Sequence, residues 1–201
     1  MLAACTLALV LLMDVSQSVN HTNYELQREG LAQAFADPQL QQTILSQPDH
    51  MVVQVQQFAS ESEVIINWRM LRTRSDIQAF VQELDQMPRS TPGILTGIGI
   101  AMQSAVQAFD HAPCVPEQRV VDVSADGSHN MGVPPSQVRD QAQAHSITIN
   151  GLPILLEADS DLPSYFREHV VTSDGFVVIA NGYQDFARAI RRKLTLEIAT
   201  R

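Results

Sequence analysis

An apolar run at the start of the chain, with the polar loop that follows it, constrains the fold more than any other feature. Residues 1–13 are interrupted only by Thr6 and lead into Asp14-Val15-Ser16-Gln17-Ser18. The run is shorter than the roughly 18 to 20 residues of a membrane-spanning helix. It lacks the basic start of a signal peptide, and the polar loop does not resemble a signal-peptidase site. A continuous apolar run ending in a polar loop is typical of a central parallel strand covered on both faces, and we predict one at 6–13.

Strand and helix patterns alternate along the rest of the chain. We predict further strands at 51–58, 63–68, 119–124, 147–156 (interrupted at 150–151) and 176–180, and helices at 20–35, 38–45, from Ser75 onward, 96–109, 134–145, 162–170 and 183–198. The polar break at 60–62 predicts a hairpin between the second and third strands. The alternation predicts an α/β fold: a doubly wound, mostly parallel sheet with helices on both faces. A length of 201 residues fits one domain, 1–201.

Composition and charge exclude several classes of protein. Hydrophobic residues make up 45% of the chain and charged residues 17%, which excludes a disordered or coiled-coil chain. The net charge is −9, from 13 basic and 22 acidic residues, and Lys193 is the one lysine. This charge argues against nucleic acid as a partner, and an acidic surface suits divalent cations.

Oxygen-bearing side chains gather where predicted strands end. Asp14, Ser16 and Ser18 follow the first strand, Asp126 follows the strand at 119–124, and Thr96 opens a helix between them. In an open α/β sheet, ligands bind beyond the carboxyl ends of the strands. Three hydroxyls and two carboxylates, without Cys or His, suit a hard cation such as Mg²⁺, Mn²⁺ or Ca²⁺ better than zinc.

These residues resemble, in the same chain order, the metal-ion-dependent adhesion site (MIDAS) of von Willebrand factor type A (VWA) domains. The resemblance rests on the Asp14-x-Ser16-x-Ser18 loop, the Thr96-x-x-Gly99 helix start and Ala125-Asp126-Gly127. Further stretches resemble an uncharacterised bacterial family of such domains, so that the likeness covers nearly the whole chain. They are Leu26-Gln27-Arg28-Glu29-Gly30, Val121-Asp122-Val123-Ser124-Ala125-Asp126-Gly127, Ile147-Thr148-Ile149-Asn150-Gly151-Leu152-Pro153-Ile154 and Ala189-Ile190-Arg191-Arg192-Lys193-Leu194.

The resemblance implies a role for each residue of the set. Ser16 and Ser18 are expected to bind the metal directly, and Thr96, Asp14 and Asp126 directly or through water. VWA sequences usually have glycines just before the threonine, whereas this chain has Gly93-Ile94-Leu95. Thr91 is therefore a candidate of lower rank for the threonine position.

The resemblance also implies a function. We expect a non-enzymatic module that holds Mg²⁺, or Mn²⁺ or Ca²⁺, and binds a carboxylate presented by a partner protein. Neutral hydroxyl ligands leave the charge of the ion under-compensated, which favours such a carboxylate in an open coordination position. One alternative is a metal-assisted hydrolase or phosphotransferase using the same oxygen atoms. Another is a structural subunit with a vestigial site.

Other motifs carry simpler interpretations. Asp122, inside an apolar strand, is expected to be a satisfied buried carboxylate paired with an arginine. His129 and Asn130 are candidates for the rim of the site, and the other histidines lack zinc spacing. Gly97-Ile98-Gly99 is not a dinucleotide fingerprint, and the chain has no nucleophile elbow or Walker loop. The basic cluster Arg188, Arg191, Arg192 and Lys193 is expected to be solvated.

The two cysteines lie at similar distances before the ends of two predicted strands. Cys5 precedes Asp14 by nine residues, and Cys114 precedes Ser124 by ten. In the VWA topology these strands are parallel neighbours, so we expect a disulfide between Cys5 and Cys114. A disulfide implies an oxidising compartment, and we expect a periplasmic or secreted protein whose signal peptide is absent from this chain.

Overall fold

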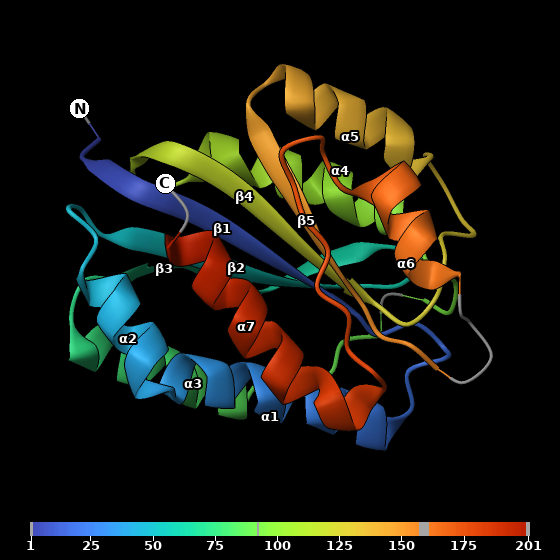
Figure 1. Cartoon of the computed structure of the whole chain (residues 1–201), viewed down its shortest axis with the longest axis horizontal. Helices are drawn as coiled ribbons and strands as arrows, with labels where there is room; N and C mark the ends of the chain where they lie inside the picture. The colour runs from blue at the N-terminus through green and yellow to red at the C-terminus, as the bar shows by residue number, and fades with distance from the viewer. Residues whose placement is uncertain (1, 92, 157–160, 200–201) are drawn as a thin grey trace.

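The computed structural model describes residues 2–91, 93–156 and 161–199, and in them five strands form one sheet (Figure 1). The strands are β1 (Ala4–Asp14), β2 (Met51–Phe58), β3 (Ser62–Leu71), β4 (Val115–Ala125) and β5 (Ile147–Pro153). Their order is β3-β2-β1-β4-β5. The β2–β3 pair is antiparallel, as predicted for a hairpin, and the other neighbours are parallel. The predicted α/β class with a mostly parallel sheet is confirmed.

Helices cover both faces of this sheet. Figure 1 shows α1 (His21–Ala36), α2 (Pro38–Leu45), α3 (Arg74–Asp85) and α7 (Phe186–Ala199) on one face, and α4 (Ile98–Ala108), α5 (Pro135–Ala144) and α6 (Leu162–Tyr165) on the other. Short helical segments are η1 (Phe109–His111), the π-helical η2 (Phe166–Val170) and η3 (Tyr183–Asp185). Among the described residues, no helix combines the length and apolar character needed to cross a membrane.

The central position of β1 explains its apolar sequence. Leu7, Leu9 and Leu11 belong to the core beneath α1, α2, α3 and α7. The alternate residues Val10 and Leu12 belong to the second core, beneath α4 and α5. Because successive side chains of a strand point to opposite faces, a strand covered on both faces must be apolar throughout.

The strand predicted at 176–180 is not a continuous strand. It lies beside β5 and forms only isolated bridges, Gly151 with Val177 and Ile154 with Ala180. Val178 N donates to Gly151 O (3.0 Å) and Ala180 N donates to Pro153 O (3.1 Å). The ladder bond between these two would need an N–H at Pro153, which proline lacks. The proline therefore interrupts the sixth strand that the apolar pattern predicts.

The interruption predicted at 150–151 does not occur, since β5 runs through both residues. Asn150 contributes hydrogen bonds through its side chain, and Gly151 allows close packing because it has no side chain. The Asn150 amide donates to Glu197 Oε1 (2.9 Å) and its Oδ1 accepts from Phe176 N (3.0 Å). A Cβ at Gly151 would lie 2.5 Å from the Phe166 ring. Turn-forming residues here serve close packing.

The predicted disulfide between Cys5 and Cys114 is present. The two Cα atoms are 5.8 Å apart, and the bridge joins the start of β1 to the residue before β4. These strands are parallel neighbours, with Cys5 in register with Pro116. The bridge closes a loop of sequence separation 109.

Candidate metal centre

The loop Asp14 to Ser18 leaves the carboxyl end of β1 and is folded tightly. Ser16 N donates to Asp14 Oδ1 (2.8 Å), and Val19 N donates to Ser16 O (3.0 Å). Asp14 and Ser16 are buried, whereas Ser18 is exposed. The carboxylate thus fixes the turn that brings the first serine back over the strand end.

The structure brings all five predicted site residues together at this edge of the sheet. Met13 is in register with Ser124, so that Asp14 and Asp126 leave neighbouring strands at the same level. Ser18 Oγ donates to Asp126 Oδ1 (2.6 Å), and the Ser16 and Ser18 Oγ atoms are 3.2 Å apart. Thr96 Oγ1 donates to Ser16 Oγ (3.3 Å). Five oxygen-bearing side chains from three separate segments therefore form one cluster.

The electrostatics of the cluster favour a cation. Burial, and then the nearby Asp126 charge, raise the pKa of Asp14 to about 7. Asp14 Oδ2 is buried and has no hydrogen-bond partner within the described ranges. A buried carboxylate oxygen without a donor is costly, and a cation at that atom removes the cost. The donor set is oxygen throughout, so the residues present fit a hard divalent ion.

Asn130 lies beside the cluster and orders the threonine through two hydrogen bonds. Thr96 N donates to Asn130 Oδ1 (2.8 Å), and Asn130 N donates to Thr96 O (3.0 Å). Neighbouring His129 is half-buried, and burial lowers the pKa of its imidazole. Thr91 is exposed. Thr96 is therefore the threonine whose hydroxyl joins the serines.

Two functional candidates escaped the sequence analysis. Tyr183, in η3, donates from its hydroxyl to Asp126 Oδ2 (2.8 Å), and burial raises the pKa of the phenol. Arg89 donates through Nη2 to Val15 O (3.1 Å) and Val19 O (2.5 Å), holding both sides of the serine loop. Neither residue belongs to a local motif, so only the tertiary structure reveals them.

The segment before Thr96 places apolar side chains beside the cluster. Ile94 is 62% exposed and Leu95 is 42% exposed. Gln17 N, inside the serine loop, donates to Ile94 O (3.1 Å). Ser60 Oγ accepts from the N–H groups of Ile94 and Leu95 (3.2 and 3.1 Å). The departure from the VWA glycines therefore gives the rim an apolar, backbone-anchored edge.

The glycine at 99 has a packing role. A Cβ at Gly99 would lie 1.9 Å from the carbonyl oxygen of Val133, so α4 can approach the segment before α5 only with glycine there. This close approach is sufficient to explain why residue 99 is a glycine, without a role in binding a nucleotide.

Asp122 pairs with Lys193 and not with an arginine. The Lys193 ammonium lies 2.6 Å from Asp122 Oδ1 and 2.5 Å from Glu197 Oε1. Lys193 is fully buried, so the expectation of a solvated cluster is wrong for this residue and holds for the exposed Arg191 and Arg192. Burial and the Asp122 charge raise the pKa of Glu197 to about 7. This ion network lies between the sheet and α7, apart from the oxygen cluster.

Comparisons with known proteins agree with this geometry. A family model described as "Protein of unknown function (DUF1194)" matches residues 4–201. No curated protein gives a significant match.

Solved structures of VWA type share the fold. Proximal thread matrix protein 1 from the mussel byssus, with a zinc-occupied MIDAS motif, has a TM-score of 0.70 at 16% identity, covering 98% of this chain and 49% of that chain. A von Willebrand factor type A protein from Catenulispora acidiphila has a TM-score of 0.64 at 13% identity, covering 98% of this chain and 43% of that chain. The pilus adhesin SpaC from Lactobacillus rhamnosus GG has a TM-score of 0.67 at 14% identity, covering 96% of this chain and 30% of that chain. The chain thus spans less than half of each, and the fold is VWA-like.

Proposed function

Because the chain belongs to the DUF1194 family and has a VWA-like fold, we propose that it is a metal-dependent protein-binding module and not an enzyme. Its site is of the MIDAS type and consists of Asp14, Ser16, Ser18, Thr96 and Asp126. The ion is Mg²⁺, with Mn²⁺ or Ca²⁺ as substitutes, and it binds a carboxylate of a partner protein. A structure of this fold with an occupied MIDAS motif and another from a pilus adhesin support the proposal.

The observation that carries the proposal is the orphaned oxygen of Asp14. Asp14 Oδ2 has no donor among the described residues, while Oδ1 of the same carboxylate is bonded to Ser16 N (2.8 Å). The Ser16, Ser18 and Thr96 hydroxyls lie within hydrogen-bond distance of each other in a chain. An ion that accepts lone pairs from these hydroxyls replaces weak hydroxyl–hydroxyl contacts with stronger ones.

The metal would supply a Lewis acid for an incoming carboxylate, and the protein supplies its surroundings. Ser18 is exposed and marks the side from which a partner approaches. Ile94 and Leu95 stand on the same rim. A partner that offers an acidic side chain flanked by apolar ones fits this surface, because the protein's net charge of −9 repels a generally acidic partner.

The disulfide supports an extracytoplasmic location. Bridges persist in oxidising compartments, so we assign the protein to the periplasm or the outside of the cell. A binding module placed there meets partners that are also exported.

Two measurements test the proposal in sequence. Calorimetric titration of Mg²⁺ and Mn²⁺ is expected to show one site in the wild type and none in Asp14→Ala, with the exposed Asp110→Ala as a matched control. Capture of a partner from native extract is then expected to disappear both with a chelator and in Asp14→Ala. Unchanged metal affinity in Asp14→Ala contradicts the site, and chelator-resistant capture contradicts the mechanism.

A further inference from the structure

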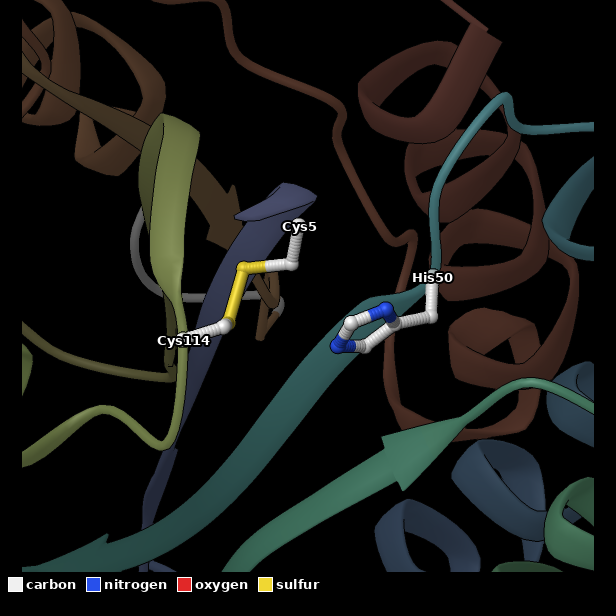
Figure 2. A group of neighbouring side chains, drawn as sticks. All are labelled: Cys5, His50 and Cys114. Carbon is white, nitrogen blue, oxygen red and sulfur yellow. A yellow bond between two sulfur atoms is a disulfide. The ribbon is translucent and has the colours of Figure 1, made fainter. Parts of the chain in front are cut away.

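Three potential metal ligands meet at the edge of the sheet opposite the oxygen cluster. Cys5 is the second residue of β1, His50 directly precedes β2, and Cys114 directly precedes β4. One ligand atom from each lies within 4.8 Å of the other two. Figure 2 shows the His50 ring reaching toward the disulfide from the neighbouring strand. The strand order β2-β1-β4 places all three side by side.

The backbone holds these residues together independently of the bridge. Thr6 N donates to His50 O (3.0 Å), and Val115 N donates to Ala3 O (2.9 Å). The Thr6 hydroxyl also bonds the backbone of Asp49 (3.3 Å). Opening the disulfide therefore leaves the two sulfurs and the imidazole near one another, because hydrogen bonds at the start of the sheet fix their backbones.

His50 has an unused ligand atom. Its Nε2 is buried and has no hydrogen-bond partner within the described part of the chain. A buried ring nitrogen without a partner is a cost to the folded state unless something binds it. The sulfurs are the side-chain atoms grouped with it, and both cysteines are buried, at 0% and 2% exposure.

We propose that the reduced form of this chain binds a thiophilic divalent ion such as Zn²⁺ through Cys5, His50 and Cys114. Two thiolates and one neutral imidazole balance a charge of +2, which a buried site requires. Two tetrahedral zinc–thiolate bonds of about 2.3 Å require a distance of about 3.8 Å between the sulfur atoms, and the sulfurs can reach this distance once the bridge is open. A fourth position stays open for water.

The two sulfurs either form the disulfide or bind the ion as thiolates. A dithiol reductant gives two electrons and two protons to the disulfide, becoming a disulfide itself, and the two thiols form. Zn²⁺ then displaces both thiol protons. A disulfide oxidant takes two electrons from the thiolates and becomes a dithiol, which restores the bridge and releases the ion. The same two sulfurs cannot do both, so metal binding here reports the redox state of the chain.

This inference does not rest on the proposed function, and the two sites differ in ligand chemistry. Within the described residues, the oxygen cluster offers hydroxyls and carboxylates, whereas the second group offers the two cysteine sulfurs and the His50 imidazole. Co²⁺ bound by thiolates shows sulfur-to-metal charge-transfer absorption, which an oxygen site does not give. An Asp14→Asn background further removes binding at the oxygen cluster.

The test uses the 201-residue chain made in a reducing cytosol and purified without oxygen, so that the bridge does not form before the metal is added. We expect charge-transfer absorption with one equivalent of Co²⁺, displaced by Zn²⁺, in the reduced chain and none in the oxidised chain. Cys5→Ser is expected to abolish the absorption. His50→Gln is expected to weaken Co²⁺ binding at least tenfold, while the exposed His111→Gln leaves it unchanged.

Two results would overturn the proposal. Reduced protein without thiolate absorption excludes metal binding by the cysteines, and unchanged affinity in His50→Gln excludes the histidine as a ligand. Circular dichroism of each sample checks the fold. Should Cys5→Ser fail to fold, the comparison of reduced with oxidised wild type decides, because it needs no substitution.

Discussion

Tyr183 and Asp126 are joined by a hydrogen bond of 2.8 Å from the phenol to Oδ2, while Oδ1 of the same carboxylate accepts from Ser18 (2.6 Å). Both oxygens of Asp126 are therefore engaged, in contrast to Asp14, whose Oδ2 has no partner in the described residues. The tyrosine comes from η3, directly before α7, so the packing of α7 positions a carboxylate of the candidate site.

Replacing Tyr183 with phenylalanine tests this positioning. Tyr183→Phe leaves a buried carboxylate oxygen without its donor, which is expected to lower the free energy of unfolding by about 1–2 kcal/mol. Loss of an orienting partner typically weakens metal binding by about 10- to 100-fold. Calorimetry with Mn²⁺ measures the affinity and urea unfolding the stability. Wild-type affinity in this variant would show that Asp126 needs no orienting donor.

Bound metal is expected to stabilise the fold. An ion that binds only the folded state adds about 2.7 kcal/mol at a concentration of 100 times Kd. It also screens Asp14 from Asp126, whose charge raises the pKa of Asp14. Thermal unfolding with millimolar Mg²⁺ or with chelator measures the effect. Asp14→Asn is expected to unfold at the same temperature in both conditions, and a wild type that does the same would favour a vestigial site.

The metal-free protein is expected to lose stability as the pH rises. The pKa of Asp14 is about 7 in the folded state, raised by burial, against 3.8 for an ordinary aspartate. The folded state therefore holds a proton that the unfolded chain releases. The free energy of unfolding falls by up to about 1.4 kcal/mol per pH unit between about pH 4 and 7 and levels off above.

The same comparison in Asp14→Asn isolates this carboxyl. Glu197, whose pKa is also about 7, contributes a fall of the same sign in both proteins. The free energy of unfolding of the wild type minus that of Asp14→Asn is expected to fall between about pH 4 and 7 and to stay constant above that range. Mn²⁺ affinity in the wild type is expected to rise over the same window, because the ion displaces the Asp14 proton. A pH-independent difference would contradict the raised pKa.

Local patterns were sufficient to predict part of this molecule and could not predict the rest. The β1 strand and the Asp14 loop are adjacent in sequence, and the ends of parallel strands meet at one edge, so Asp14, Ser16 and Asp126 could be placed together. The contacts of Tyr183 and Arg89, and the pairing of Lys193 with Asp122, join distant segments that no short pattern encodes. At 176–180 the apolar pattern predicted a strand, and the missing N–H of Pro153, far along the chain, prevented it.

The disulfide is expected to carry much of the stability. The bridge closes a loop of sequence separation 109, and chain-entropy arguments give about 4.7 kcal/mol for a loop of about 100 residues, with measured losses typically of 2–5 kcal/mol. Cys5→Ala with Cys114→Ala is expected to unfold at lower urea concentration by a free energy within that range. Dithiol treatment of the unfolded wild type is expected to lower its refolded stability similarly. A loss below about 1 kcal/mol would show that the start of the sheet is held by its hydrogen bonds alone.

The buried Lys193 network makes a separate prediction. Lys193 lies 2.6 Å from Asp122 and 2.5 Å from Glu197, and all three side chains are buried. Lys193→Met leaves two buried carboxylates without a cation, which is expected to lower the free energy of unfolding by about 3–5 kcal/mol. Arg192→Met, an exposed neighbour on α7, is expected to change it by less than about 0.5 kcal/mol. Adding Asp122→Asn and Glu197→Gln to Lys193→Met removes both uncompensated charges and is expected to recover at least half of the loss in urea unfolding. A triple variant as unstable as Lys193→Met alone would show that the uncompensated charges of Asp122 and Glu197 do not cause the loss.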